Sequence, residues 1–398
     1  MIRTASAAHK DWRRRGNVTD IDRCPAQGFP TGTHHAREPR NATDPLVRAM
    51  LKQIKRTVLR ASRGAGTFRL LRNSEWRKNR LLIIGYHGVA LDDEHRWSPT
   101  LYVTPRVLED RFKILRDGGY AVLPLGEAVS RLAAGTLPPR SVCLTFDDGF
   151  ADFALEAFPL LEQFGFPATV YLTTYYTRYN RPIFGLICSY MLWKTSRAEL
   201  RSTDLLPGVA SERWNLRSPA DRQRAHQAIV RHADAAGLSA REKDELAQRV
   251  AVALEIDYQG LVRRRILSLL TPAEVTSLSA AGVDFQLHTH RHRTPVDEHA
   301  FAREIRDNRR ELAELTGKNT AHFCYPSGVY EPEFLPWLKE AGVVSATTCD
   351  TGIASQSTNP LLLPRLIDTM NLSPVEFESW VSGAGAFLPL RRHQPTHG

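Results

Sequence analysis

The sequence of 398 residues is poor in cysteine and has no long apolar run. Its cysteines are few and scattered: Cys24, Cys143, Cys188, Cys324 and Cys349. An odd number at such spacings excludes a disulfide framework and a CxxC zinc or redox motif. No stretch approaches the roughly 18 to 20 apolar residues of a membrane span, and the N-terminus lacks a signal-peptide core. These absences predict a cytoplasmic protein, with peripheral attachment at the inner face of the membrane left open.

The net charge of +10 belongs to one end of the chain. Residues 1–80 hold 19 of the 53 lysines and arginines but only 6 of the 43 acidic residues, so the remainder is nearly neutral. Nucleic-acid binding by the folded part is therefore not supported. Residues 1–44, rich in Arg, Gly, Pro and Thr, are predicted to form a disordered basic leader.

Residues 45–80 are predicted to form a basic amphipathic helical segment. Apolar residues recur there at helical spacing: Leu46, Met50, Ile54 and Val58. Two interpretations stay open, namely a solvated helix that packs on the folded body and peripheral membrane contact through residues 45–63. Met50 is an alternative start, and removal of residues 1–63 is expected to leave activity on a soluble substrate unchanged.

From residue 81 onward, apolar runs alternate with helical patterns. The predicted strands are Leu81–His87, Ala121–Leu125, Val142–Phe146, Thr169–Thr173, Val283–His288, His322–Tyr325 and Val343–Thr348. Helix starts are indicated by the pairs Thr104-Pro105, Thr271-Pro272 and Glu331-Pro332. Such alternation predicts an α/β fold with a mostly parallel sheet, closed or nearly closed as a barrel, over residues 81–370. Residues 175–270 interrupt it as a helical insertion, and residues 371–398 form a C-terminal helix and tail.

Two motifs follow predicted strands, where the chemistry of such folds gathers. The first, "LTFDDGF" at residues 144–150, places Asp147 and Asp148 side by side after a buried strand. The second, "QLHTHRHRTP", holds His288, His290 and His292 within five residues. Imidazoles with a carboxylate suit a divalent metal such as zinc, and the second aspartate suits a base that acts on water.

The two motifs resemble those of the NodB-type polysaccharide deacetylases, carbohydrate esterase family 4. TFDDG matches residues 145–149, and His-[Ser/Thr]-x-x-His matches residues 288–292. The resemblance implies a distorted (β/α)7-type barrel in which Asp147 is the catalytic base. It also implies that Asp148, His288 and His292 hold the metal, whereas His290 is not a ligand.

The third family motif, Arg-x-Pro-Tyr-Gly, is only partly present, as "CYPSG" at residues 324–328. The resemblance assigns Ser327 and Tyr325 to the substrate and the oxyanion. The arginine that normally orients the base is replaced by Cys324, which is expected to be a small packed thiol. Arg365 is the proposed substitute, and a surface or structural role for it stays open.

The late histidine that the family uses as general acid is missing. His87, in "IIGYHGV" after the first predicted strand, resembles the YH of poly-N-acetylglucosamine deacetylases with rearranged motifs and is expected to replace it. The alternative is a core histidine that braces the strand.

The resemblance implies a hydrolase that removes N-acetyl groups from an amino-sugar glycan in exopolysaccharide or surface-glycan metabolism. Two alternatives stay open: an amidohydrolase for a lipid-linked sugar or a non-carbohydrate amide, and a catalytically silent glycan-binding domain.

Overall fold

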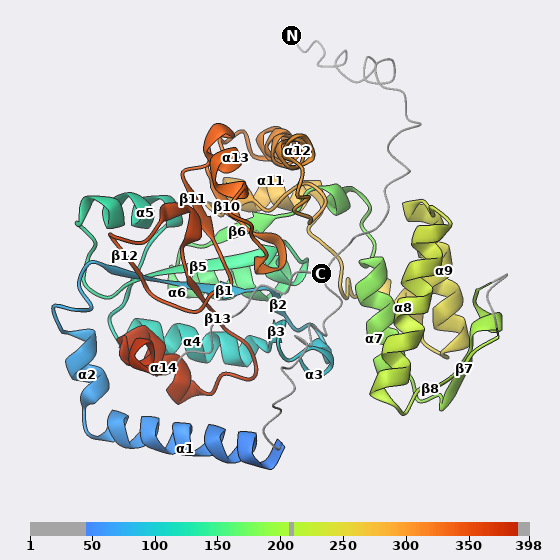
Figure 1. The fold of residues 1–398 in the computed structure, drawn as a ribbon, viewed down its shortest axis with the longest axis horizontal. Coiled ribbons are helices and arrows are strands. Elements are labelled where there is room, and N and C mark those ends of the chain that lie inside the picture. The colour runs from blue at the N-terminus through green and yellow to red at the C-terminus, as the bar shows by residue number, and fades with distance from the viewer. Residues whose placement is uncertain (1–44, 207–210, 389–398) are drawn as a thin grey trace, which may run out of the picture.

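The computed structural model describes residues 45–206 and 211–388. The disordered leader predicted for residues 1–44 therefore lies outside the described part of the chain, as does the predicted tail after residue 388. Figure 1 shows a twisted sheet surrounded by helices, with a separate group of helices beside it.

The strands are short and belong mainly to one sheet. They are β1 (Arg80–Tyr86), β2 (Gly88–Val89), β3 (Tyr102–Val103), β4 (Ala121–Val122), β5 (Ser141–Asp148), β6 (Thr169–Leu172), β7 (Glu199–Arg201), β8 (Arg213–Asn215), β9 (Asp284–Leu287), β10 (His322–Cys324), β11 (Ser345–Thr347), β12 (Ala354–Ser355) and β13 (Arg365–Ile367). The main sheet runs β11-β10-β9-β6-β5-β1, with β4 on β5 and both β12 and β13 on β1. All its pairs are parallel except β1 with β12.

The sheet curls toward closure. Strand β13 pairs with β1, and Leu363 just before it bridges Thr347 at the end of β11. The first and last strands of the series are thus joined by one β-bridge, and the predicted distorted α/β barrel is confirmed. Because the strands are parallel, their carboxyl ends meet at one rim, where the two sequence motifs lie.

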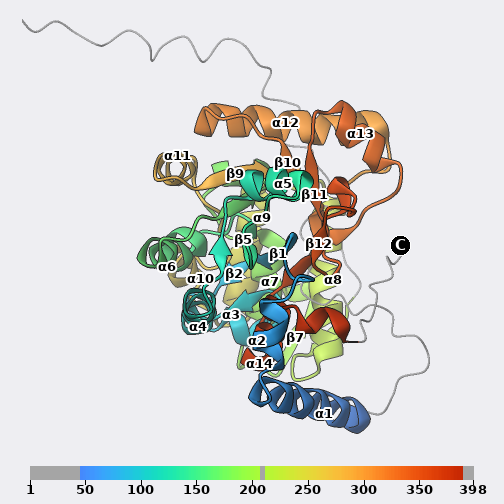
Figure 2. The same ribbon diagram turned by 90° about the vertical axis from the view of Figure 1, so that its left-hand side faces the viewer.

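Helices lie around the sheet, apart from the separate group beside it (Figures 1 and 2). They are α1 (Pro45–Gly64), α2 (Thr67–Arg72), α3 (Glu94–Trp97), α4 (Pro105–Asp117), α5 (Leu125–Ala134), α6 (Phe158–Phe164), α7 (Phe184–Lys194), α8 (Pro219–Ala235), α9 (Ala240–Ala253), α10 (Tyr258–Arg263), α11 (Pro272–Ala280), α12 (Glu298–Thr316), α13 (Phe334–Glu340) and α14 (Pro374–Ser382). Within the described residues, no helix combines the length and the hydrophobicity that crossing a bilayer requires.

Two of the three predicted helix starts are where the sequence places them. Thr104 accepts a hydrogen bond from the Val107 N–H at the start of α4, and Thr271 forms a capping box with Glu274 at the start of α11. The third prediction is displaced, because α13 begins at Phe334, two residues after Pro332.

Alternation along the strands separates two apolar layers. Leu82 and Ile84 of β1 face the outer helices, whereas Leu81 and Ile83 belong to a smaller cluster inside the barrel. The inner cluster also contains Cys143 and Cys324, so the barrel interior is packed and only its rim is available for chemistry.

The insertion predicted at residues 175–270 has its own core. Helices α7, α8 and α9 bury a large apolar cluster that includes Trp214, and this cluster also takes in Tyr102 and Phe150 of the barrel rim. Bridges join Phe150 to Leu269 and Pro182 to Ser268. The insertion is therefore attached to the rim that carries the first motif, beside the barrel in Figure 1.

Helix α1 packs on the folded body through one face. Leu59 is 3% exposed and forms a small apolar cluster with Phe68 and Val375. Arg56 pairs with Glu376 of α14 at 3.1 Å, between Nε and Oε2. Removal of residues 1–63 would therefore uncover part of this cluster, while the expectation that it leaves activity on a soluble substrate unchanged stays a prediction.

We expect deletion of residues 1–63 to lower the free energy of unfolding by about 2 kcal/mol or more, since burial of one leucine contributes about 1.5–3 kcal/mol. Thermal melting of the purified protein measures this loss. Deletion of residues 1–44, which leaves α1 in place, is the control. Equal melting temperatures for the two truncations would contradict the contribution assigned to α1.

Candidate active site

Three segments bring five polar side chains to the rim of the barrel. His87 follows β1, Asp147 and Asp148 end β5, and His288 and His292 follow β9. Strands β1 and β5, and β6 and β9, pair in parallel register, which aligns these carboxyl ends. Residues about 140 positions apart in sequence are thereby placed in contact.

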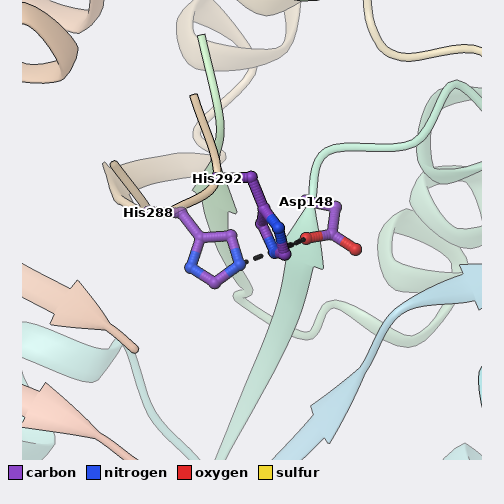
Figure 3. Close-up of side chains that lie close together, drawn as sticks. All are labelled: Asp148, His288 and His292. Atoms are coloured by element: carbon purple, nitrogen blue, oxygen red, sulfur yellow. Dashed lines mark hydrogen bonds and ion pairs between the residues drawn. The ribbon is translucent and has the colours of Figure 1, made fainter. Parts of the chain in front are cut away.

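The three predicted metal ligands converge (Figure 3). The Nε2 atoms of His288 and His292 each lie 3.1 Å from Oδ1 of Asp148, and the three ligand atoms lie within 4.8 Å of one another. The side chains are buried, with 4%, 2% and 6% of Asp148, His288 and His292 exposed. Two nitrogens and one oxygen around a buried point are a donor set that can hold a divalent metal ion.

The hydrogen bond on the other side of His288 indicates that a cation belongs here. Its Nδ1 lies 2.9 Å from the carbonyl oxygen of Cys324, so Nδ1 carries the proton and donates it. In the neutral ring the Nε2 lone pair then faces the Asp148 carboxylate, which is repulsive unless positive charge lies between them. Burial favours the neutral ring, yet Cys324 and Asp148 outweigh it and hold the pKa of His288 well above its ordinary value, so the required positive charge is either a proton on Nε2 or a metal ion in its place. The residues present thus fit a bound metal ion.

Asn308 of α12 supports the ligand His288 and was not predicted. Its Oδ1 accepts a hydrogen bond of 2.9 Å from the backbone N–H of His288, and its Nδ2 donates to the Leu172 carbonyl and to Thr174 Oγ1. Asn308 thereby connects the loop that carries His288 and His292 to the end of β6. No sequence motif identifies an asparagine in the middle of a helix as a residue that supports a metal ligand.

Asp147 is held by a buried arginine. Nη1 and Nη2 of Arg365 each lie 2.8 Å from a different oxygen of the carboxylate, a bidentate pair in which Arg365 is 0% and Asp147 2% exposed. Burial opposes ionisation of Asp147, but Arg365 outweighs it and keeps the pKa of Asp147 below its ordinary value. Asp147 is therefore a fixed, ionised carboxylate beside the metal site.

Arg365 reaches Asp147 from the start of a strand. It begins β13 and, like Cys143, lies opposite Ile83, so its backbone is four residues below Asp147 along the barrel. Its side chain extends past Gly85 toward the carboxyl ends of the strands. A Cβ atom added at Gly85 would lie 3.2 Å from Nη1 of Arg365 and 2.7 Å from Cδ1 of Ile367. The side chain that was proposed as a substitute from sequence is thus buried and in contact with the base.

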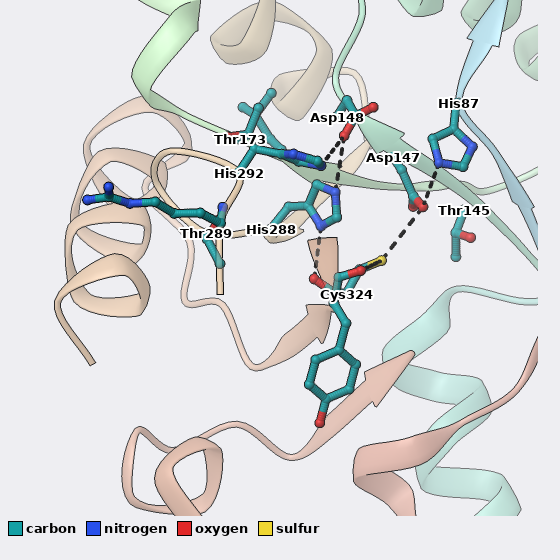
Figure 4. Close-up of polar contacts among 12 residues, drawn as sticks. His87, Thr145, Asp147, Asp148, Thr173, His288, Thr289, His292 and Cys324 are labelled. Carbon is teal, nitrogen blue, oxygen red and sulfur yellow. Dashed lines mark hydrogen bonds and ion pairs between the residues drawn. The ribbon is translucent and has the colours of Figure 1, made fainter. Parts of the chain in front are cut away.

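His87 and Cys324 contact the same carboxylate (Figure 4). The Nε2 atom of His87 lies 3.6 Å from Oδ2 of Asp147, and the Cys324 thiol approaches the same oxygen at 3.6 Å. Cys324 also accepts a hydrogen bond of 3.1 Å from Arg365 Nη2. The cysteine is packed as expected, but it contacts the base, a contact that the sequence did not indicate.

The assignment of Tyr325 to the substrate does not agree with the structure. Its hydroxyl donates to the Leu361 carbonyl at 3.0 Å, its N–H donates to the Thr347 carbonyl, and its ring is fully buried in the outer core. Both donors are therefore engaged away from the site. Ser327 is exposed and has a left-handed backbone with φ 57°, and its role toward an oxyanion stays a prediction.

His290 makes its hydrogen bonds outside the cluster of Asp148, His288 and His292. Its Nδ1 lies 2.9 Å from Thr174 Oγ1, and its backbone carbonyl accepts a hydrogen bond from the Tyr175 N–H. Burial, aided by Arg291 and other nearby arginines, lowers the pKa of His290 to about 3. It remains neutral and braces the loop between the ligands.

Both motifs contain non-glycine residues with a left-handed backbone. Asp148, Thr289 and His292 have φ values of 68°, 62° and 56°. Non-glycine residues adopt this region at a cost that the surrounding structure must offset, and such residues cluster at functional sites. Gly149 follows with φ 79°, and an added Cβ would lie 2.1 Å from Leu172 Cδ1, so the glycine of the first motif is required for close packing.

Comparisons with known proteins agree with this geometry. The family model described as "Polysaccharide deacetylase" matches residues 134–214 and 222–346. The poly-beta-1,6-N-acetyl-D-glucosamine N-deacetylase of Escherichia coli K12 is 33% identical over 100 residues, which cover 25% of this chain and 15% of that protein. YxkH of Bacillus subtilis, named as a polysaccharide deacetylase, is 28% identical over 137 residues, covering 33% of this chain and 45% of the relative.

A solved structure shares the fold. The Streptococcus pyogenes deacetylase PplD, in complex with acetate, aligns with a TM-score of 0.50 and 20% identity, over 78% of this chain and 99% of that one. The chain spans less than half of the length of either curated relative above. The family model nevertheless covers about half of the chain and includes both motifs, so this chain belongs to the polysaccharide deacetylase family.

Proposed function

We propose that the protein is a metal-dependent hydrolase that removes N-acetyl groups from an amino-sugar polysaccharide or oligosaccharide, in exopolysaccharide or surface-glycan metabolism. One observation carries the proposal: an ionised, arginine-held Asp147 stands directly beside the cluster of Asp148, His288 and His292. A buried ion pair or a histidine cluster alone would not indicate an enzyme, because each also occurs as a purely structural element.

Different side chains of the protein carry out the two proton transfers of amide hydrolysis. Asp147 accepts a proton from the attacking water while a C–O bond forms at the acetyl carbon. His87, which has 19% of its side chain exposed, donates a proton to the sugar nitrogen as the C–N bond breaks, releasing acetate and a free amine. A bound zinc ion would polarise the carbonyl and lower the pKa of water. Arg365 takes no proton and keeps Asp147 in position.

Zinc is the proposed metal. The two imidazoles and one carboxylate leave room for water in a tetrahedral site, which is the arrangement of catalytic zinc. Burial lowers the pKa of His292 in spite of Asp148, so this ring tends to be neutral, the form that binds metal.

The substrate class is tested by acetate release across a panel. We expect release from N-acetylated glucosamine oligomers, including the β-1,6-linked polymer named for the Escherichia coli relative, and none from small cyclic amides. Activity confined to lipid-linked sugars or cyclic amides would instead favour another amidohydrolase. Full glycan affinity without acetate release by metal-loaded protein would favour a silent binding domain.

Removal of the metal should abolish the activity. We expect a chelator to reduce acetate release to background and zinc to restore it, because the ion supplies several kcal/mol of transition-state stabilisation. His292→Ala should lose both metal and activity, whereas His290→Ala, outside the cluster, should retain the metal. Metal analysis by mass spectrometry checks both variants, and full metal occupancy in His292→Ala would exclude it as a ligand.

His87→Gln should slow the reaction without affecting the metal. General acid–base groups contribute roughly 10²–10⁴-fold, and His87 is not a member of the ligand cluster. The measurement is kcat for acetate release together with zinc content. A fall of less than about twofold in kcat would leave His87 as a residue that only braces the end of β1.

A further inference from the structure

Helix α1 presents an apolar face to solvent. Four large apolar side chains are about half exposed there: Met50 56%, Leu51 52%, Ile54 50% and Val58 53%. The spacing of Met50, Ile54 and Val58 by four residues, and of Leu51 and Val58 by seven, places them on one side of the helix. They account for four of the eleven large exposed apolar residues in the described part of the chain.

The helix is fixed in this orientation by its opposite face. Lys55 lies 3.3 Å and Arg56 3.1 Å from Glu376 of α14, and Arg63 lies 2.8 Å from Glu378. Leu59 is buried between these ion pairs. Rolling the helix to hide its apolar face would break all of these contacts. The arrangement is unusual, because an amphipathic helix on a globular body normally turns its apolar face inward.

The segment that carries the exposed face is basic. Lys52 and Arg60 are exposed on α1, and Arg69 is exposed on α2 beside Leu70, itself 72% exposed. Residues 45–74 contain no aspartate or glutamate. In both views α1 lies along the outer edge of the molecule, with no other described element beyond it (Figures 1 and 2).

We propose that this face of α1 docks on an anionic phospholipid bilayer. The apolar side chains enter the boundary between headgroups and acyl chains, while the net positive charge of residues 45–74 draws the helix to the lipid phosphates. A second copy of the chain is disfavoured as the occupant, because two such faces would bring like charges together with no acidic residue between them. The proposal is independent of the deacetylase activity.

Vesicle sedimentation with the full chain tests the docking. We expect binding to vesicles of phosphatidylcholine with phosphatidylglycerol, weak binding to phosphatidylcholine alone, and loss of binding at high salt. The double variant Ile54→Glu/Val58→Glu should bind the anionic vesicles at least about tenfold more weakly. The matched control is Val252→Glu on α9, where the valine is 79% exposed on a helix of the insertion, and its binding should equal that of the unaltered protein.

Each other outcome overturns the proposal. Unchanged binding of the double variant would assign membrane contact to a different surface. A dimer in light scattering that Ile54→Glu/Val58→Glu dissociates, without vesicle binding, would make the face an interface between copies. Vesicle binding that appears only after deletion of residues 1–44 would show that the chain's own N-terminal segment covers the face. Melting temperatures of all variants establish that they are folded.

Discussion

Asp147→Asn should reduce the turnover number by roughly 10⁴-fold, at the upper end of the effect of a general base, while zinc stays bound. Asparagine has nearly the same shape as aspartate but cannot accept the proton of the attacking water. The metal should remain because the cluster of Asp148, His288 and His292 does not include Asp147. Acetate release and zinc content, measured on the same preparation, check the two halves of this expectation.

Asp148→Asn is the matched control, since it changes the adjacent carboxylate in the same way. It should lose zinc, because both imidazoles face its Oδ1. If Asp147→Asn loses zinc and Asp148→Asn keeps it, the two aspartates have the opposite roles.

Arg365→Met should both inactivate and destabilise the protein. The substitution leaves the buried Asp147 carboxylate without its bidentate partner, and removal of one member of a buried pair costs about 3–5 kcal/mol. Asp147 would also lose its fixed orientation toward the metal site. Denaturant unfolding measures the first effect and kcat the second.

Arg111→Met is a control that breaks a buried ion pair outside the candidate active site. Arg111 is also buried, at 2% exposed, and its Nε lies 2.9 Å from Oδ2 of the buried Asp368. This variant should cost a similar free energy of unfolding but keep most of the activity under conditions where it is folded.

The double variant Asp147→Asn/Arg365→Met should regain part of the stability lost by Arg365→Met, because no unpaired carboxylate remains. A stable, active Arg365→Met protein would exclude Arg365 from positioning the base.

Much of the barrel could be predicted because its strands are buried on both faces. Continuous apolar runs such as those of β1 and β5 are distinctive, and each of the seven predicted strands overlaps a strand of the structure. β13 could not be found in the same way. It has only three residues, Arg365–Ile367, and begins with a charged one, so neither length nor alternation marks it.

Location in the cytoplasm and the boundaries of the predicted segments stay predictions of the sequence. The orientation of α1 illustrates why surfaces are harder to derive. Its periodicity indicates an amphipathic helix, but the ion pairs of Arg56 and Arg63 with α14 determine that the apolar side faces outward. Those partners lie more than 300 residues away, and helical periodicity carries no information about them.

The sequence by itself determined the family of this protein and which residues are candidates for its chemistry: adjacent aspartates after one buried strand and histidines at ligand spacing after another predict a base and a metal site. Only the tertiary structure decided which side chains complete that site. Arg365 reaches Asp147 along the interior of the barrel, Cys324 contacts the same carboxylate, and Tyr325 turns into the core. The physical reason is that residue type fixes what a group can bind, whereas its neighbours across strands and helices depend on packing between distant segments.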